Sequence, residues 1–190
     1  FLTFSFLWDT YLGSKLGENF LAINAILMQF IILSAFFLDA YAFTTEGVVG
    51  FAIGRRNKKS FLAVVKNSTQ ISFLTSLIIS IFYLIFFKEI INIVTNVEIL
   101  RFLSYKYIIW ILIIPPAASF CYQLDGIFIG ATQTKELRNG MMFSVVSFII
   151  ISIYLTKYFG NHGLWLSLLL LMIFRSLTLN FYFDKILKKF

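Results

Sequence analysis

The sequence predicts an all-α integral membrane protein, a helical bundle of about six transmembrane helices of which the first is truncated. Of the 190 residues, 59% are hydrophobic and 13% charged, and the mean hydropathy is +0.87. The charged share is about half of that in a soluble domain. The apolar residues form long continuous runs, not the alternating pattern of a membrane β-barrel. These observations exclude a soluble enzyme, a disordered chain and a disulfide scaffold.

Polar turns divide the chain into spans of the length that a bilayer requires, about 20 mostly apolar residues. Residues 1–13 form a partial span that begins inside an apolar run, so we expect the chain to be a fragment without its N-terminal part. Residues 88–101 alternate apolar and charged positions, which predicts an amphipathic segment along the membrane interface. The complete spans are expected at 20–53, 61–87, 102–131, 141–159 and 164–183.

Basic residues distinguish the two ends of the expected bundle. The loops at 54–60 and 132–139, the C-terminus and Lys66 hold ten of them, and the opposite side holds five. An excess of Lys and Arg marks the cytoplasmic side, so we expect a multi-pass protein of the inner membrane with its C-terminus in the cytoplasm. Topology and anionic lipid therefore explain the net charge of +7. We expect no nucleic-acid partner, because no basic surface with interleaved aromatic residues is found.

Four acidic residues lie inside spans, where charge is costly and often functional: Asp9, Asp39, Glu46 and Asp125. Asp39 and Glu46 are separated by two helical turns and project from one face. Carboxylates in this setting can bind and release a proton, or coordinate a small cation together with carbonyl and hydroxyl oxygens. The alternative for Glu46 and Asp9 is a simple anchoring role, because both lie near the end of a span.

Two adjacent prolines, Pro115 and Pro116, precede Asp125 in the same span. Each proline removes a backbone donor and crowds the preceding turn, so the pair predicts a helix kink or break near mid-span. Broken helices in transporters expose carbonyls beside a binding cavity. Asp125 is therefore a candidate for cation coupling or substrate binding. The alternative is a structural kink with Asp125 paired to a basic residue.

Other residues carry weaker hypotheses. Tyr41 and Tyr122, with Phe43 and Phe128, flank the acids and can stack on flat cationic compounds. Arg175 is the one basic residue well inside a span. We expect its side chain to extend toward the cytoplasm, and the alternative is a carboxylate partner.

Glycines recur at helical spacing in the two spans that carry the candidate acids. Gly50 and Gly54 form one Gly-x-x-x-Gly pattern, and Gly126 and Gly130 form another. This pattern permits close helix approach in lipid.

Enzyme motifs are absent from the sequence, which contains no P-loop, Gly-x-Ser-x-Gly, His-Glu-x-x-His or Cys-x-x-Cys. The single cysteine, Cys121, cannot form an intrachain disulfide, and no metal cluster can be built around it. We therefore expect a protein that is not an enzyme and holds no resident metal.

Two stretches of the chain carry a family resemblance. One is Leu38-Asp-Ala-Tyr-Ala-Phe-Thr-Thr-Glu-Gly, followed by Gly50-Phe-Ala-Ile-Gly-Arg-Arg-Asn57. The other is Cys121-Tyr-Gln-Leu-Asp-Gly-Ile-Phe-Ile-Gly-Ala-Thr-Gln-Thr-Lys-Glu-Leu-Arg-Asn139, followed by Gly160-Asn-His-Gly-Leu-Trp165. They resemble the second half of the multidrug and toxic compound extrusion (MATE) family, and most closely its DinF-type branch.

The resemblance implies twelve helices in two six-helix lobes around a central cavity, with this chain as the C-terminal lobe. It also implies multidrug efflux, in which H⁺ or Na⁺ is exchanged for organic, often cationic, compounds by alternating access. Asp125 falls where sodium-coupled relatives keep a cation-binding acid, although residues 1–5 lack the glutamate that those relatives pair with it. The implied partners are the lipid bilayer, an N-terminal lobe and a small organic cation, with H⁺ or Na⁺ as coupling ion and no other cofactor.

Two further functions stay open. A flippase for lipid-linked saccharides, from the same superfamily, needs a basic cavity for the pyrophosphate, and here only Arg175 lies within a span. A non-transporting membrane assembly or sensory domain leaves the intramembrane acids and the double proline unexplained.

Overall fold

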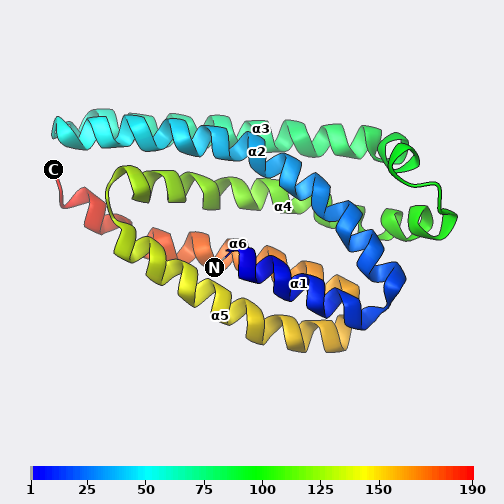
Figure 1. Ribbon diagram of the computed structural model, residues 1–190. Helices are drawn as coiled ribbons and strands as arrows, with labels where there is room; N and C mark the ends of the chain where they lie inside the picture. The colour runs from blue at the N-terminus through cyan, green and yellow to red at the C-terminus, as the bar shows by residue number, and fades with distance from the viewer. Residues whose placement is uncertain (1) are drawn as a thin grey trace.

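The computed structural model describes residues 2–190, which form six helices joined by short turns (Figure 1). Within these residues no strand is found. Five helices, α2 to α6, are long and apolar enough to cross a membrane. The all-α membrane class is therefore confirmed. The helices are α1 (Leu2–Leu16), α2 (Glu18–Gly54), α3 (Lys58–Val94), α4 (Glu98–Gly130), α5 (Thr134–Phe159) and α6 (Asn161–Leu187).

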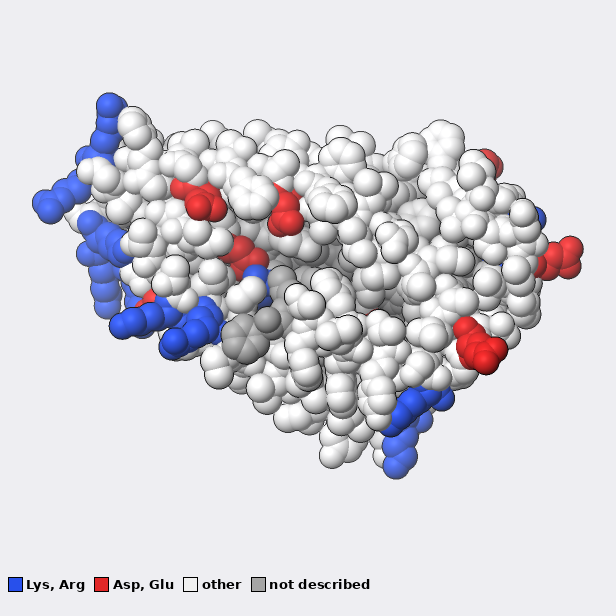
Figure 2. Space-filling model, in the orientation of Figure 1, with Lys and Arg blue, Asp and Glu red and all other residues white. Residues whose placement is uncertain are grey.

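Successive helices run in opposite directions along the bundle (Figure 1). The α2–α3 turn, the α4–α5 turn and the C-terminus lie at one end, and the other turns lie at the opposite end. Lys185 of α6 pairs with Glu136 of α5 at 3.0 Å, and Lys189 donates to the carbonyl of Ala131. Figure 2 shows basic side chains gathered at this end of the molecule, which we call the basic end.

Helix α3 has the polarity of a helix in lipid rather than in water. Its buried stripe includes Ser72, Ser76 and Ser80, one helical turn apart. Its outward face is apolar, with Ile78 67% and Leu84 59% exposed. Small hydroxyl residues let membrane helices approach closely, whereas large apolar side chains contact acyl chains. The distribution of polar and apolar residues on α3 therefore fits a bilayer.

The double proline does not break α4, so the predicted helix break is wrong. The helix continues without interruption through Pro115 and Pro116. Pro116 lacks the N–H that would bond the carbonyl of Leu112 one turn earlier. The hydroxyl of Ser80 on α3 donates to that carbonyl at 2.9 Å. In membranes, side chains of neighbouring helices commonly satisfy carbonyls that a proline frees.

Residues 88–101 do not form a helix of their own, and their placement along the membrane interface stays a prediction. Helix α3 continues to Val94, and α4 begins at Glu98. Arg101 stabilises the turn between them, because its Nε donates to the carbonyl of Thr95 at 2.8 Å. Carbonyls at a helix C-terminus need such donors. The alternating pattern thus belongs to the end of one helix and the start of the next.

Buried apolar side chains form three clusters along the bundle. The largest includes Tyr83, Ile111 and Trp165, and a second, at the basic end, includes Phe61 and Phe128. A smaller cluster consists of Leu38, Ala118, Cys121 and Met172, with Tyr122 packed against it. The cluster with the fewest buried apolar side chains therefore lies beside the intramembrane polar residues.

Helices α2 and α4 cross closely because α4 carries glycine at two contact points. A Cβ added at Gly126 would collide with the backbone of Ala42, and one at Gly130 with the backbone of Glu46. The two glycines are one helical turn apart, the spacing that permits close approach of membrane helices. This crossing fixes the part of α2 that carries Asp39 and Glu46 against the part of α4 that carries Asp125.

We expect Gly126→Ala to lower the free energy of unfolding of the full-length protein by about 1–3 kcal/mol, as overpacking does elsewhere. Gly47→Ala on α2 is the matched control, because nothing lies within 4 Å of a Cβ at that position. Thermal unfolding of the purified variants in detergent measures the difference. Equal unfolding midpoints for the two variants would contradict the close crossing.

Candidate functional site

A cleft of about 370 Å³ opens between α1, α2, α4, α5 and α6. Figure 2 shows acidic side chains gathered beside a hollow on this face of the molecule. We call it the acidic cleft, because three of the four candidate acids line it together with Arg175. The remaining wall is largely apolar and includes Phe6, Phe36, Phe43, Tyr122, Met141 and Met172.

Helix α2 contributes two of the carboxylates. Asp39 and Glu46 are both half-buried, and both line the acidic cleft. Residues seven apart on a helix share a face, so the spacing accounts for their common orientation. Within residues 2–190, neither carboxylate forms an ion pair or a side-chain hydrogen bond. Both groups are therefore open to a ligand in the cleft.

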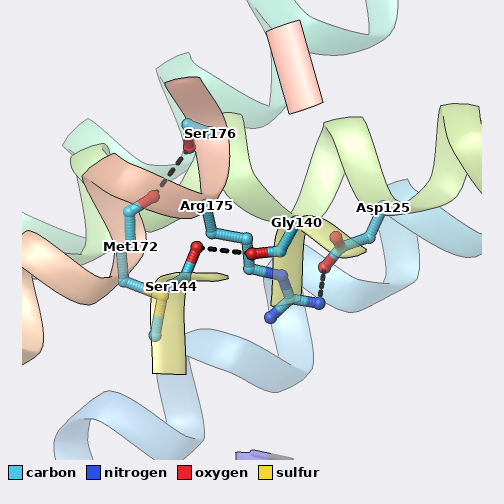
Figure 3. Close-up of polar contacts among 6 residues, drawn as sticks. All are labelled: Asp125, Gly140, Ser144, Met172, Arg175 and Ser176. Carbon is cyan, nitrogen blue, oxygen red and sulfur yellow. Dashed lines mark hydrogen bonds and ion pairs between the residues drawn. The ribbon is translucent and has the colours of Figure 1, made fainter. Parts of the chain in front are cut away.

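The third carboxylate belongs to Asp125 on α4, and it is paired with Arg175 on α6. Arg175 Nη2 lies 2.5 Å from Asp125 Oδ2 (Figure 3). The side chains are 4% and 13% exposed for Arg175 and Asp125 respectively. The expectation that Arg175 extends toward the cytoplasm is therefore wrong, and the carboxylate-partner alternative is confirmed. A guanidinium inside the hydrocarbon region is costly, and a carboxylate at the same depth offsets that cost.

The Asp125–Arg175 pair does not use all of its hydrogen-bonding capacity. Asp125 Oδ1 and Arg175 Nε are both buried without a hydrogen-bond partner among the residues that the structure describes. Buried polar atoms of this kind are uncommon and call for an explanation, such as a ligand or a functional role. Arg175 also interacts electrostatically with Asp39. The guanidinium of Arg175 thus forms an ion pair with an acid on α4 and interacts electrostatically with another acid on α2.

The two tyrosines proposed as cavity aromatics lie in different places. Tyr122 lines the acidic cleft, whereas Tyr41 lines a separate groove between α2 and α3. The hydroxyl of Tyr41 accepts a hydrogen bond from Thr75 Oγ1 at 3.0 Å. Tyr41 follows Asp39 by two residues, which on a helix points the two side chains to different faces. The assignment of Tyr41 to the cavity is therefore wrong.

The aromatic wall of the cleft comes mainly from phenylalanines. Phe43 lines the cleft, while Phe128 is buried in the apolar cluster at the basic end. Sequence reasoning missed Phe36, although it precedes Asp39 by three residues and helical spacing places it on the same face. It also missed Phe6, which reaches the cleft from α1. No local pattern could have found that long-range placement.

The fourth acid, Asp9, lies outside the acidic cleft. It lines a separate cavity between α1 and α2 and is only 4% exposed. The alternative of a simple anchoring role near the end of a span stays a prediction.

The arrangement defines a polytopic helical membrane protein with an acid-lined cleft, a class that includes transporters. The chain matches the family model named MatE over residues 1–157. It is 36% identical over 170 residues to DNA damage-inducible protein F of Escherichia coli (strain K12), an alignment that covers 90% of this chain and 37% of that protein. The chain belongs to the MATE family of membrane transporters. It spans well under half the length of this relative.

Proposed function

We propose that this chain is one lobe of an exporter that exchanges protons or sodium ions for small organic cations by alternating access. The observation that carries the proposal is the acidic cleft. Asp39 and Glu46 line it without a basic partner among the described residues, beside an acid that Arg175 already neutralises. Membership of a transporter family supports the same reading.

The charge balance of the cleft favours a cation. When all groups are ionised, Asp39, Glu46 and Asp125 face a single guanidinium. Unbalanced negative charge inside a low-dielectric region attracts a cation strongly. A proton or Na⁺ can neutralise a carboxylate when the organic cation is absent. Competition between the two for the same carboxylates would couple their movements in opposite directions.

The walls of the cleft suit the apolar body of an organic cation. Phe36 and Phe43 are exposed on α2, and Phe6 and Tyr122 complete an aromatic surface beside the acids. Aromatic faces attract cations as well as flat rings. The cleft volume of about 370 Å³ is at the lower end of the range for small-molecule sites. In our proposal, an N-terminal lobe supplies the opposite wall of a larger cavity.

The orientation in the membrane follows from the basic end. We propose that the α2–α3 turn, the α4–α5 turn and the C-terminus face the cytoplasm. The concentration of Lys and Arg at this end supports that orientation through the positive-inside rule. In a bacterial cell the membrane would be the inner one.

The flippase alternative fits the cleft less well. A pyrophosphate-linked lipid needs several cationic donors, and among the described residues Arg175 is the single basic one lining the acidic cleft. Its charge is already neutralised by the ion pair with Asp125. The cleft is therefore better suited to a cation than to a phosphorylated lipid.

Reconstitution tests the proposed exchange. We expect full-length protein in proteoliposomes to move a fluorescent organic cation against its gradient when a proton or sodium gradient is imposed. A neutral analogue of similar size should move no faster than in protein-free liposomes. The proton and sodium arms identify the coupling ion. Transport that responds to neither gradient would contradict the proposal.

A further inference from the structure

A groove of about 450 Å³ lies between α2 and α3, on the side of α2 that faces away from the acidic cleft. Thr44 and Val48 of α2 line it. Each is two residues from Glu46, and two residues correspond to about 200° around a helix. The acids of the cleft therefore project from one side of α2, and the groove residues project from the other. We call this hollow the α2–α3 groove.

The α2–α3 groove has the length of one membrane leaflet. On α3 it is lined at successive turns from Ser60 to Ile71, which is a rise of about 16 Å along the helix. The hydrocarbon core of a bilayer is about 30 Å thick, so half of the core matches this rise. One end of the groove lies at the α2–α3 turn, and the exposed side chains of Val48 and Ile71 border it farther along. An acyl chain of the leaflet at the basic end thus fits along the groove.

Exposed basic residues lie at the end of the groove where α2 passes into α3. They are Arg55, Arg56, Lys58 and Lys59, which we call the basic turn. Figure 2 shows basic side chains gathered at this end of the molecule. The ion pairs found within residues 2–190 involve other side chains, and the sequence has no Asp or Glu from 47 to 88. The local sequence therefore offers the basic turn no carboxylate partner.

The groove offers hydrogen-bond donors and no acid. Ser60 and Asn67 line it, and neither side chain forms a hydrogen bond to another residue that the structure describes. The hydroxyl of Ser60 and the amide of Asn67 can each donate a hydrogen bond. Phosphodiester and ester oxygens accept such bonds and cannot donate them. These donors beside the basic turn complement the headgroup region of a phospholipid, whereas an organic cation finds no carboxylate in the groove.

Membrane topology explains positive charge at one end of a bundle, but it does not explain a groove that begins at that charge. An occupant of both needs an anionic head and an apolar tail. Clusters of Lys and Arg beside membrane helices, and basic pockets between such helices, favour anionic lipid headgroups. We propose that the basic turn and the α2–α3 groove bind one anionic phospholipid of the leaflet at the basic end. Its phosphate lies at the basic turn, and one acyl chain lies along the groove.

Helix α2 forms a wall of both the groove and the acidic cleft. Thr45 lines the groove, and the next residue, Glu46, lines the cleft. The hydroxyl of Thr45 donates to Gln123 Oε1 on α4 at 2.9 Å. Gln123 is two residues from Asp125 in the sequence. A lipid in the groove thus packs against the turn of α2 that carries Glu46 and stabilises its position against α4.

Native mass spectrometry of the purified full-length protein tests the lipid site without transport. The protein is titrated with phosphatidylglycerol or with phosphatidylcholine that carries the same acyl chains. We expect the wild type to bind one phosphatidylglycerol at least tenfold more tightly than phosphatidylcholine. Ala63→Phe fills the groove and keeps the charges of the basic turn, so it should weaken this binding at least tenfold. Leu62→Phe is the matched control, because Leu62 is 44% exposed and does not line the groove.

A second pair of variants tests the charge. Lys58→Gln with Lys59→Gln should weaken phosphatidylglycerol binding at least tenfold. Lys135→Gln with Arg138→Gln removes as much charge from exposed residues at the same end, outside the groove, and should leave the binding unchanged.

Equal affinity of the wild type for the two lipids would overturn the proposal, because it would indicate an unselective annular lipid only. Unchanged binding by Ala63→Phe, or equal losses in the two charge variants, would also overturn it, since the basic end would then attract headgroups without a groove. If Ala63→Phe does not fold, Ala63→Leu fills less of the groove and should weaken binding at least threefold. These measurements need no ligand in the acidic cleft, so failure here is distinguishable from failure of the proposed exchange.

Discussion

Arg175→Gln is expected to lower the free energy of unfolding of the full-length protein by about 3–5 kcal/mol. Arg175 is 4% exposed and lies 2.5 Å from Asp125, so the substitution leaves a buried carboxylate without its counter-charge. Removing one member of a buried pair is costly for this reason, whereas removing both can be nearly neutral. Thermal and denaturant unfolding of purified protein in detergent measure the loss.

Two further variants distinguish the effect of breaking the buried ion pair from the effect of removing a charged side chain. The double variant Arg175→Gln with Asp125→Asn should recover most of the lost stability, because no unpaired charge remains. Lys185→Gln is the control, since it removes the Lys185–Glu136 pair in which Lys185 is 53% exposed. Pairs of this kind contribute at most about 1 kcal/mol. If Arg175→Gln proved as mild as Lys185→Gln, the buried pair would not stabilise the bundle.

Asp125→Asn is expected to reduce exchange by the full-length protein at least tenfold while membrane insertion continues. The substitution frees the guanidinium of Arg175, which already interacts electrostatically with Asp39. An unpaired positive charge in the cleft repels an organic cation and competes for the remaining carboxylates. A tenfold loss corresponds to about 1.4 kcal/mol. A single unpaired charge in a low-dielectric site can change the binding free energy of a cation by that amount. Gradient-driven transport in proteoliposomes measures the effect.

Restoring the charge balance should restore part of the transport. In the double variant Asp125→Asn with Arg175→Gln, Asp39 and Glu46 again face the cleft without a competing guanidinium. We therefore expect a higher exchange rate than with Asp125→Asn alone. Asp184→Asn, at an exposed site, should transport normally. Unchanged exchange by Asp125→Asn would show that the Asp125–Arg175 pair has only a structural role.

Local rules account for the part of the fold that the sequence predicted. Long apolar runs and short polar turns identify membrane helices because each helix satisfies its own backbone hydrogen bonds in lipid. The common face of Asp39 and Glu46 follows from helical periodicity alone. The Gly126–Gly130 spacing indicated a close approach, and the structure shows that the partner is the backbone of α2.

The errors concern contacts between segments far apart in the chain. Nothing local indicated that Arg175 turns toward Asp125, since the pairing depends on how α6 is rotated against α4. The prolines broke no helix, and Ser80 on another helix donates to one of the carbonyls that they free. Tyr41 was assigned to the cavity by proximity in sequence, although its helical angle directs it to Thr75 on α3. For Arg175 the rotation of α6 against α4 decided the outcome, whereas helical periodicity alone could have separated Tyr41 from Asp39.

Equilibrium binding of a lipophilic cation, tetraphenylphosphonium, to the purified full-length protein tests the central claim most directly. If Asp39 and Glu46 bind the transported cation, the wild type should bind tetraphenylphosphonium in competition with H⁺ or Na⁺. The double variant Asp39→Asn with Glu46→Gln should lose at least tenfold in affinity and lose that competition. Affinity that is unchanged in the double variant would contradict the assignment of the acidic cleft as the cation-binding site.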